Sequence, residues 1–418
     1  MRVAVVGSGV SGLTCTHLLG SRHDVTLFEG DDRPGGHAHT SRVTVAGREL
    51  PVDTGFIVYN EQTYPLFTRL LEELGIETRP SEMSFSVSDE EAGLEWASTS
   101  LRSVFAQPRN LARPSFLRML NEIVRFNRAA RRLLTDGADP DATVGEFLAV
   151  HGCSEEFVKW YLVPMGAAIW SADPAEFLAF PAVALARFFE SHGLLQVAGR
   201  PTWRTIVGGS ATYVGAVVEP LGDRLRLGDR VDKVVRRRGA VELVTATGEV
   251  EQYDHVVIAT HSDQALRLLA DPTDLEQEVL GAIRYRSNVA TLHTDERLLP
   301  SRRSARASWN WRRRPGVTGA TLTYDLGRLQ GLDTDVPICL TLNEPGAIDA
   351  GSVLATMDYA HPVYDAAAMR AQRRHGEVSG VDGVSYCGAY WGYGFHEDGA
   401  RSAVEVCRAL GVTWGTAP

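Results

Sequence analysis

The sequence predicts an α/β protein of two domains (α+β overall), in which one domain is built around a parallel sheet and the other is inserted between its segments. A β-branched run, a glycine-rich turn and an apolar helix follow one another at residues 2–20, and the same order returns at residues 383–411. The chain has 418 residues, of which 44% are hydrophobic. This length exceeds one ordinary domain and can bury a sizeable core.

Composition and charge exclude several classes of protein. The net charge of −10 and a pI near 5.7, without a long run of one sign, give no reason to expect nucleic-acid binding. The five cysteines are scattered, without disulfide or metal-ligand spacing, so we expect a reducing cytoplasm and no metal site. No apolar stretch approaches the ~20 residues that span a bilayer, and no secretory signal is expected.

The first glycine turn predicts a Rossmann-like dinucleotide site. Gly7 allows the tight turn, Gly9 the approach of a pyrophosphate to the backbone, and Gly12 the packing of helix on strand. Glu29 ends the next strand, "DVTLFEG", where its carboxylate accepts hydrogen bonds from a ribose hydroxyl. The same segments add Ser11 and Gly30 to the predicted cofactor site. This turn alone does not separate FAD from NAD.

The loop "DDRPGGHAHT" after Glu29 carries a family resemblance. Arg33, Gly35 and Gly36 match an Arg-x-Gly-Gly loop, and here the sequence resembles the flavin amine oxidase superfamily, which includes protoporphyrinogen oxidases and phytoene desaturases. The resemblance implies FAD, with this loop along the diphosphate and flavin. Paired glycines suit such close backbone approach. Many amine oxidases have arginine where this chain has His37, which we also expect near the flavin.

Later landmarks of the superfamily follow in order. The resemblance places Val231 near the adenine, although a valine in a strand is also typical of an ordinary core. "GVSYCGAYWGYGFHEDGARS" resembles the C-terminal flavin motif, and its helix start offers free amides to a flavin carbonyl. The residues of this motif that we expect at the cofactor are Gly388, Trp391, Gly394, Phe395 and His396. Some of its aromatic residues are equally suited to packing the strand.

These landmarks predict a discontinuous FAD-binding domain and an interleaved substrate domain. The first comprises residues 1–80, 200–285 and 375–418, and the second residues 81–199 and 286–374. Residues 99–199 are expected to be mostly helical. "RSNVATLHTD", "TGATLTYDL" and "PICLTLN" are expected to be strands of a sheet on the substrate side.

The chemistry implied by the resemblance is hydride transfer to a flavin. Many amine oxidases hold a water near the flavin with a lysine from a substrate-side strand, but the corresponding strand here has none. His293 is the candidate substitute, and Asp295, two positions on, is expected to share its strand face. The alternatives are a structural histidine and a surface ion pair. Further candidates for the cavity are Met165, Trp170, His192, Trp203 and Arg204.

A second resemblance concerns the substrate. "VDTGFIVYNEQTYPLFTRLLEELGI", "HTD" at 293–295 and "GYGFHEDG" resemble a bacterial group of flavin oxidoreductases that is similar to the flavin-binding N-terminal part of plant-type cyclopropane fatty acid synthases. It implies a dehydrogenase or desaturase that takes hydride from an unsaturated or methylated fatty acyl chain. The alternatives are a fatty acid double-bond isomerase, an amine oxidase, and a non-catalytic flavoprotein that supports a lipid methyltransferase. FAD is expected to be non-covalent, because no cysteine lies in a recognised attachment motif.

Residues 110–134 predict a basic amphipathic helix. Leucine, isoleucine and valine form one side, and five arginines (Arg118, Arg125, Arg128, Arg131 and Arg132) decorate the other. Such a helix can lie on an anionic membrane at its cytoplasmic face. The alternative is a packed helix with a solvated charged face.

Overall fold

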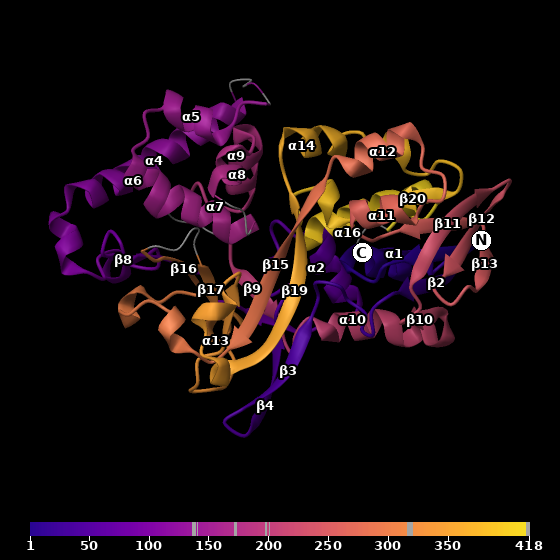
Figure 1. The fold of residues 1–418 in the computed structure, drawn as a ribbon, viewed down its shortest axis with the longest axis horizontal. Coiled ribbons are helices and arrows are strands. Elements are labelled where there is room, and N and C mark those ends of the chain that lie inside the picture. The colour runs from indigo at the N-terminus through magenta and orange to yellow at the C-terminus, as the bar shows by residue number, and fades with distance from the viewer. Residues whose placement is uncertain are drawn as a thin grey trace.

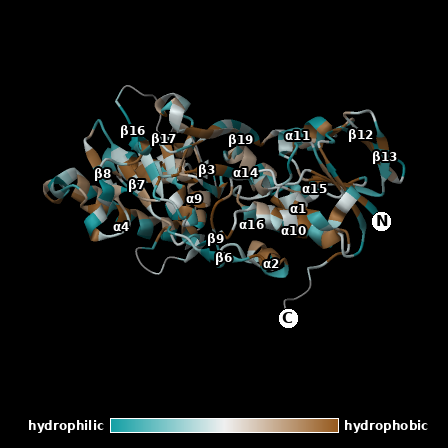
Figure 2. Ribbon diagram, turned by 90° about the horizontal axis from the view of Figure 1, so that it is seen from below, coloured by the Kyte–Doolittle hydropathy of each residue, from teal (hydrophilic) through white to brown (hydrophobic). Residues whose placement is uncertain are grey.

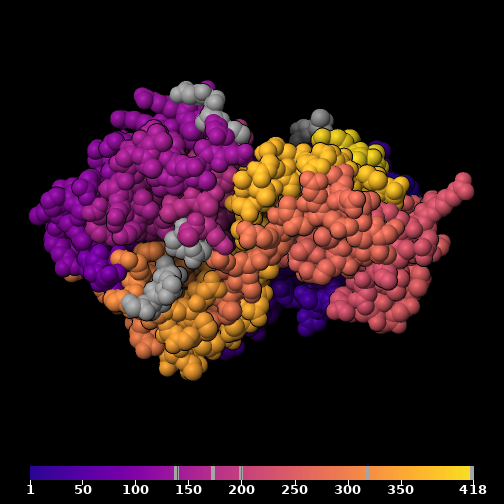
Figure 3. All heavy atoms as spheres, turned by 45° about the horizontal axis from the view of Figure 1, so that its top comes forward, coloured from indigo at the N-terminus to yellow at the C-terminus, as the bar shows by residue number. Residues whose placement is uncertain are grey.

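The structure is a computed structural model that describes residues 1–414 except 136–138, 140, 171–173, 197–198, 200 and 316–320. The predicted domain boundary at residue 200 and the end of the last predicted segment, 415–418, lie outside the described residues. Two main sheets organise the chain, and Figure 3 shows the corresponding two lobes, with the early helical segment on one side and the C-terminal residues over the other.

The first sheet is parallel and contains both ends of the chain. Its order is β10-β2-β1-β14-β20, and every neighbouring pair is parallel. The strands are β1 (Arg2–Val6), β2 (Asp24–Glu29), β10 (Leu225–Leu227), β14 (His255–Ile258) and β20 (Val384–Tyr386). Val3, Ala4 and Val5 of β1 are fully buried, as expected of a parallel strand covered on both faces.

Helices and a small sheet cover the two faces of this parallel sheet. Val3 and Val5 pack toward α1 (Val10–Leu19), α10 (Ala211–Val218) and α16 (His396–Ala409). Ala4 and Val6 pack toward a meander of β11 (Val231–Arg237), β12 (Ala240–Thr245) and β13 (Val250–Tyr253). Helix α11 (Ser262–Leu268) lies beside β11 (Figure 1), and α12 (Asp274–Gly281) packs on α11, on α14 (Ala366–Gln372) and on α15 (His375–Val378), which precedes β20. The predicted strand–turn–helix order is confirmed at both ends.

The second sheet is mixed and has seven strands in the order β19-β15-β18-β17-β16-β7-β8. The strands are β7 (Phe85–Asp89), β8 (Leu94–Ala97), β15 (Arg284–His293), β16 (Trp309–Arg313), β17 (Thr321–Asp325), β18 (Cys339–Leu342) and β19 (Val353–Val363). Only β16 and β7 pair in parallel. The three predicted substrate-side strands correspond to β15, β17 and β18, and the long β15–β19 pair runs beside the parallel-sheet lobe (Figure 1).

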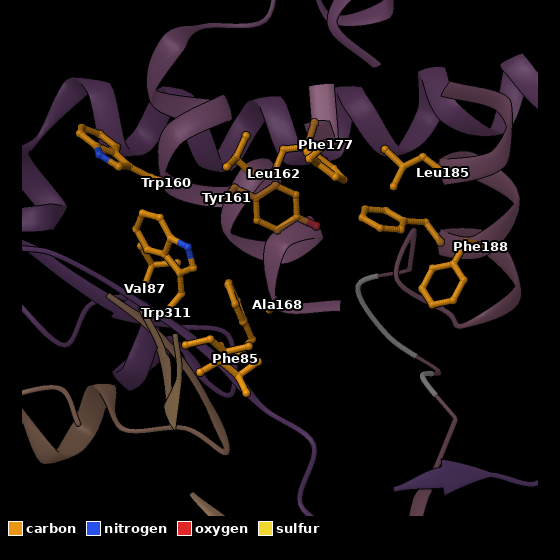
Figure 4. Close-up of a cluster of buried hydrophobic side chains, with 14 of the residues drawn as sticks. Phe85, Val87, Trp160, Tyr161, Leu162, Ala168, Phe177, Leu185, Phe188 and Trp311 are labelled. Atoms are coloured by element: carbon orange, nitrogen blue, oxygen red, sulfur yellow. The ribbon is translucent and has the colours of Figure 1, made fainter. Parts of the chain in front are cut away.

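A helical layer packs on one face of the seven-stranded sheet. It contains α3 (Leu101–Val104), α4 (Pro114–Thr135), α5 (Val144–Val150), α6 (Glu155–Phe157), a π-helical turn (Val158–Leu162), α7 (Val163–Trp170), α8 (Pro174–Leu178) and α9 (Ala182–Ser191). In Figure 4, Val87 and Trp311 of the sheet meet Trp160 and Leu162 of this layer. The largely helical character predicted for residues 99–199 is confirmed for the described residues. Helix α4 carries both hydrophilic and hydrophobic residues (Figure 2).

The remaining elements are short. These are β3 (Thr40–Val45), β4 (Arg48–Asp53), β5 (Tyr59–Asn60), α2 (Pro65–Glu73), β6 (Thr78–Pro80), β9 (Trp203–Ile206) and α13 (Leu326–Gln330), with 3-10 turns at Pro108–Ala112, Glu219–Arg224, Glu296–Leu298, Arg303–Ala305, Pro345–Ala347, Ala350–Ser352 and Ala389–Trp391. In the described part of the chain, no helix has the length and apolar character needed to cross a bilayer.

The predicted domain segments can be compared with the sheets. All strands of the parallel sheet fall within 1–80, 200–285 and 375–418. The strands of the mixed sheet fall within the other two segments, except that β15 begins at Arg284, inside the predicted FAD segment. The boundaries themselves stay a prediction, while the α/β fold with a Rossmann-like part is confirmed.

Candidate flavin site and adjoining pocket

The first glycine turn joins β1 to α1 in a conformation that only small residues accept. Gly7 has φ +101°, and a Cβ on Gly12 would lie 1.9 Å from the carbonyl oxygen of Gly7. The helix therefore begins directly against the turn. A Cβ on Gly9, in contrast, would meet no atom within 4 Å, and Gly9 caps α1 without a side-chain hydrogen bond. The open space lies beside unpaired amides at a helix start, which stabilise an anion.

A hydrogen-bond network holds the predicted loop beside this turn. The Glu29 carboxylate accepts from the Ser8 backbone N–H (2.9 Å), the Ser8 hydroxyl (2.5 Å) and the Asp31 backbone N–H (3.0 Å). The Ser8 hydroxyl oxygen accepts from the Gly35 N–H (2.9 Å). A Cβ on Gly36 would lie 3.3 Å from the Cα of Gly9. Glu29, the turn and the loop are thus brought together, and Ser8 is a residue that the sequence analysis missed, although it stands between two glycines of the motif.

Two side chains of this loop leave buried nitrogen atoms without a partner among the described residues. Arg33 donates from one Nη to the Gly36 carbonyl (2.9 Å), but its other Nη has none, and His37 Nε2 has none. The same holds for the hydroxyls of Tyr364 and Tyr390 and for Trp391 Nε1. Unpaired buried polar atoms cost ~1–3 kcal/mol each. Together with the open space at Gly9, they fit a polar ligand of dinucleotide type.

The C-terminal motif lies against the same turn. A Cβ on Gly399, in the first turn of α16, would lie 2.6 Å from Val10 Cγ1 and 2.8 Å from Ser11 Oγ, so the beginnings of α16 and α1 are in direct contact. Gly394 has φ +91°, and a Cβ there would lie 2.7 Å from the Tyr364 hydroxyl. Both helix starts and the orphaned Tyr364 hydroxyl therefore converge on one region.

The other residues predicted from this motif pack against different neighbours. His396 stacks on Phe56 with ring centroids 3.5 Å apart and bonds the Tyr213 hydroxyl, while Phe395 packs on Phe188. Trp391 packs on a neighbouring histidine and tyrosine. The remaining predicted cofactor residues lie as follows: Gly388 packs on the ring of Tyr390, Gly30 faces Arg230, and Val231 is a buried residue of β11.

His37 belongs to a cluster of buried aromatic and imidazole rings. Its ring centroid is 4.9 Å from Tyr359, 5.4 Å from His361 and 5.9 Å from His261. Burial lowers the pKa of His37 well below its usual range and the pKa of His361 to about 4, and neighbouring imidazoles add to both effects. These rings are therefore neutral at physiological pH.

A pocket opens beside this cluster, between α7 and α8 on one side and β15 and β19 on the other. Its unfilled space amounts to about 430 Å³ only when the solvent at its open mouth is included. The apolar part of its lining is formed by Trp170, Phe177, Phe180, Pro362, Val363 and Tyr364, and the polar part by Glu176, Arg286, Asn288 and His361. Arg286 and Glu176 form an ion pair of 2.8 Å. The only lysines of the sequence, Lys159 and Lys233, are not among the lining residues.

Of the five cavity residues expected from the sequence, the structure places one in this pocket. Trp170 lines it, and His192 lies nearby, stacked on Phe188 at 3.9 Å. Trp203 lies beyond His192, with 6.3 Å between the ring centroids. Arg204 bonds Thr78 instead, and Met165 packs against the core of the helical layer. The polar lining residues were missed because a sequence pattern describes one strand at a time. The pocket forms only where β15 and β19 lie side by side, and their pairing is not visible in either strand alone.

His293 and Asp295 lie at the far end of β15. His293 is fully buried, bonds Thr341 through Nε2 (2.7 Å) and accepts the Asp295 backbone N–H at Nδ1 (3.1 Å). It is five residues from Asn288, roughly 17 Å along an antiparallel strand, and it does not line the pocket. Burial lowers its pKa to about 4. Its catalytic role stays a prediction.

The expectation that Asp295 shares the strand face of His293 is wrong, because β15 ends at His293. The Asp295 carboxylate caps the following turn and binds the Arg297 guanidinium at 2.8 and 2.6 Å. This pairing holds the pKa of Asp295 well below its usual range. The Asp295 carboxylate therefore forms an ion pair, which was the alternative to a role beside His293. Only the Asp295 backbone contacts the imidazole.

A known protein resembles part of this chain in sequence. A relative from Mycobacterium tuberculosis, which bears the name of a flavin-containing monoamine oxidase, AofH, is 26% identical over 285 residues. The match covers 65% of this chain and 59% of the relative, so the chain spans about three fifths of that relative's length.

Solved structures share the fold over nearly the whole chain. Putrescine oxidase bound to putrescine has a TM-score of 0.69 at 16% identity, covering 98% of this chain and 99% of that chain. A fatty acid isomerase from P. acnes that produces CLA has a TM-score of 0.68 at 15% identity, covering 98% of both chains. Cyclohexylamine oxidase from Brevibacterium oxydans has a TM-score of 0.67 at 16% identity, covering 98% of this chain and 99% of that chain.

The resemblance to the flavin amine oxidase superfamily is thereby confirmed, while the one to the cyclopropane synthase group stays a prediction. A family described as flavin containing amine oxidoreductase matches residues 10–329, well over half of the sequence. The chain belongs to the flavin-containing amine oxidoreductase family.

Proposed function

We propose that the protein takes hydride from a hydrophobic substrate, an unsaturated or methylated fatty acyl chain, and that its flavin is non-covalent FAD. The observation that carries the proposal is the pocket beside the cluster of His37, whose walls are mainly apolar and whose few polar groups include no lysine. Apolar walls with a small number of placed polar groups suit a long apolar substrate with one polar end.

The residues around the first turn fit FAD. Glu29 stands at the end of β2, where a ribose hydroxyl is bound in Rossmann-like folds, and the open space at Gly9, the N-cap of α1, has room for the diphosphate. Cys15, Cys387 and Cys407 are fully buried and pack together in the core, with sulfur atoms 3.8–3.9 Å apart. Cys339 is also buried, and Cys153 belongs to the helical lobe. This arrangement supports non-covalent binding.

The chain's own groups position the substrate and exclude water. A bound flavin would supply the hydride acceptor, taking one hydrogen with the electron pair of the breaking C–H bond, and the second hydrogen of a desaturation would leave as a proton. Trp170, Phe177 and Phe180 would hold an acyl chain by apolar contact. The pair of Arg286 and Glu176 would meet the polar end of the substrate. The neutral imidazoles near His37 avoid adding charge beside the cofactor.

We also propose that α4 brings the protein to its lipid substrate at the cytoplasmic membrane surface. Leu117 and Val124 are 42% and 37% exposed on this helix, and they stand seven residues apart, so they share one face. No described residue pairs with the side chains of Arg128 or Arg132, which are exposed beside them. The single acid of α4, Glu122, is buried. A lipid methyltransferase is the alternative partner for this surface.

The test is an anaerobic titration of the purified holoprotein. An oleoyl phospholipid is added while the visible spectrum is recorded, and an amine panel that includes putrescine serves as the control. Loss of the oxidised flavin band with the phospholipid alone is the expected result. Bleaching by amines and not by the phospholipid would refute the acyl substrate. If the phospholipid is altered without net flavin reduction, the reaction is an isomerisation.

A further inference from the structure

At the pocket wall, the Val289 backbone amide and the side-chain amides of Asn343 and Asn288 form a chain of hydrogen bonds. Each donor and acceptor in this chain can be assigned. The Val289 backbone N–H donates to Asn343 Oδ1 (3.0 Å), and only an oxygen can accept there. Asn343 Nδ2 must therefore point the other way, and it donates to Asn288 Oδ1 (2.7 Å). Asn343 has φ +59°, a left-handed conformation that asparagine tolerates, and its own N–H bonds the Val289 carbonyl. Its amide orientation is thus set by backbone groups.

The orientation of Asn288 follows, and it sets the state of His361. Asn288 Oδ1 accepts from Asn343 Nδ2, and the other amide atom of Asn288 lies 3.3 Å from the Arg286 carbonyl oxygen, which can only accept. These two contacts identify that atom as the nitrogen. It lies 2.8 Å from His361 Nδ1, and because an amide nitrogen can only donate, Nδ1 is the acceptor. A ring nitrogen that accepts a hydrogen bond carries no proton, so the proton of neutral His361 lies on Nε2.

We propose that His361 is a catalytic residue that binds the polar atom of the substrate as a hydrogen-bond donor through Nε2, and that Asn288 and Asn343 are positioning residues that fix this tautomer. His361 lines the pocket, and no described residue bonds its Nε2. The proposal rests on the proposed function and names the substrate group: a hydrogen-bond acceptor such as an acyl carbonyl oxygen. A protonated amine is itself a donor and finds no acceptor at this nitrogen.

Geometry and burial agree with this assignment. Asn288 is only 1% exposed, so solvent does not compete for its amide. Burial lowers the pKa of His361 to about 4, with a further contribution from His261. The ring therefore stays neutral at pH 7, and the question that remains is whether its one proton lies on Nδ1 or on Nε2.

The first part of the test is the ¹⁵N NMR spectrum of the holoprotein labelled at histidine, with His361 identified by its absence in His361→Gln. Long-range ¹H–¹⁵N correlations distinguish the two neutral tautomers. The expected result at pH 7 is a protonated Nε2 and an unprotonated Nδ1. Asn343→Gly keeps a residue that accepts φ +59° and removes the amide, so we expect a share of His361 to move its proton to Nδ1. A wild-type ring with its proton on Nδ1 overturns the proposal.

The second part compares two substitutions in flavin reduction by an oleoyl phospholipid. The amide nitrogen of His361→Gln reaches the place of Nε2, whereas that of His361→Asn reaches only the place of Nδ1. We expect a rate within about 3-fold of wild type for the first and about 10-fold lower for the second. His17→Asn, at a histidine that pairs with Glu73 elsewhere, is the control for substitution itself.

The outcomes separate this proposal from the proposed function. Equal rates for His361→Gln and His361→Asn, with the phospholipid active, overturn the role of His361 and leave the acyl substrate intact. A phospholipid that leaves the flavin oxidised in wild type overturns the acyl substrate instead, and the tautomer is still read from the spectrum.

Discussion

Two glycines of the first turn are constrained in opposite ways. Gly12 has no room for a side chain, because its Cβ would lie 1.9 Å from a backbone oxygen that cannot move without opening the turn. Gly9 has room in the protein itself, but the space next to it is where a cofactor diphosphate would approach. The same residue type is therefore required by the fold at one position and by the ligand at the other.

Substitution by alanine separates these two requirements. We expect Gly12→Ala to lower the thermal midpoint of the apoprotein strongly or to prevent folding. Gly9→Ala should keep the apoprotein midpoint and lower flavin affinity by at least about 10-fold, measured by fluorescence titration of flavin into apoprotein. Gly346→Ala, at an open position with ordinary φ, should change neither quantity. Equal flavin affinity in Gly9→Ala and Gly346→Ala would place the cofactor elsewhere.

The lowered pKa of the buried His293 predicts that the free energy of unfolding depends on pH. Its pKa is about 4 in the folded protein and near 6.5 for a solvent-exposed histidine. Between these values the unfolded chain binds a proton that the folded protein does not, so the free energy of unfolding falls as pH decreases from about 6.5 to 4. This shift corresponds to up to about 3 kcal/mol. His293→Gln should show a shallower decline than wild type between pH 7 and 4 in denaturant unfolding.

The same variant decides between two roles for His293. Its bonds to Thr341 and to the Asp295 backbone are those of a structural residue, and a structural role predicts flavin reduction within about 2-fold of wild type at pH 7. A loss of 10-fold or more with an unchanged flavin content would support the catalytic role. Parallel pH profiles of unfolding in the two proteins would contradict the buried neutral imidazole.

At the scale of elements, strand patterns were predictable and strand partners were not. A strand was expected at residues 286–295 and the structure has one at 284–293, and the lack of lysine there was evident. The pocket, however, depends on β15 pairing with β19 so that Asn288 stands opposite Tyr359 and Arg286 opposite His361. Register between segments some 70 residues apart is set by packing and turns, which period-two patterns do not encode. Hence His293 was singled out in place of His361.

A basic amphipathic helix was predicted for residues 110–134, and α4 covers Pro114–Thr135, but Leu117 and Val124 of the predicted apolar side are exposed. This outer face carries the next prediction. Each arginine near an anionic bilayer contributes about 1 kcal/mol of attraction. We expect R125E/R128E/R132E to lower binding to vesicles containing phosphatidylglycerol by at least 10-fold in a sedimentation assay, with little effect on neutral vesicles. The control R22E/R230E/R238E reverses three exposed arginines outside this helix and changes the net charge equally. Equal losses in the two triple variants would contradict a specific membrane face on α4.

At the scale of the whole molecule, the candidate site depends on contacts between the two ends of the chain. β1 and α1 come from the first 19 residues, while β20 and α16 begin after residue 383. The repeated strand–turn–helix order made both ends recognisable in the sequence. The sheet order was not predictable, because β14 separates β1 from β20 and pairs with both through non-local contacts. The cofactor region is therefore complete only after the last segment has joined the first.

Gly399 tests this dependence, because it lies where the two ends touch. A Cβ there would lie 2.6 Å from Val10 Cγ1 and 2.8 Å from Ser11 Oγ, so Gly399→Ala must push α16 away from the start of α1. Overpacking of this kind costs typically ~1–3 kcal/mol. We expect a lower thermal midpoint and, because both helix starts face the same ligand space, weaker flavin binding in fluorescence titrations. Gly376→Ala, in α15 with no atom near its added Cβ, should leave both unchanged. If Gly399→Ala loses stability but binds flavin as tightly as wild type, the contact between the ends supports the fold alone, and the ligand does not lie between the two helix starts.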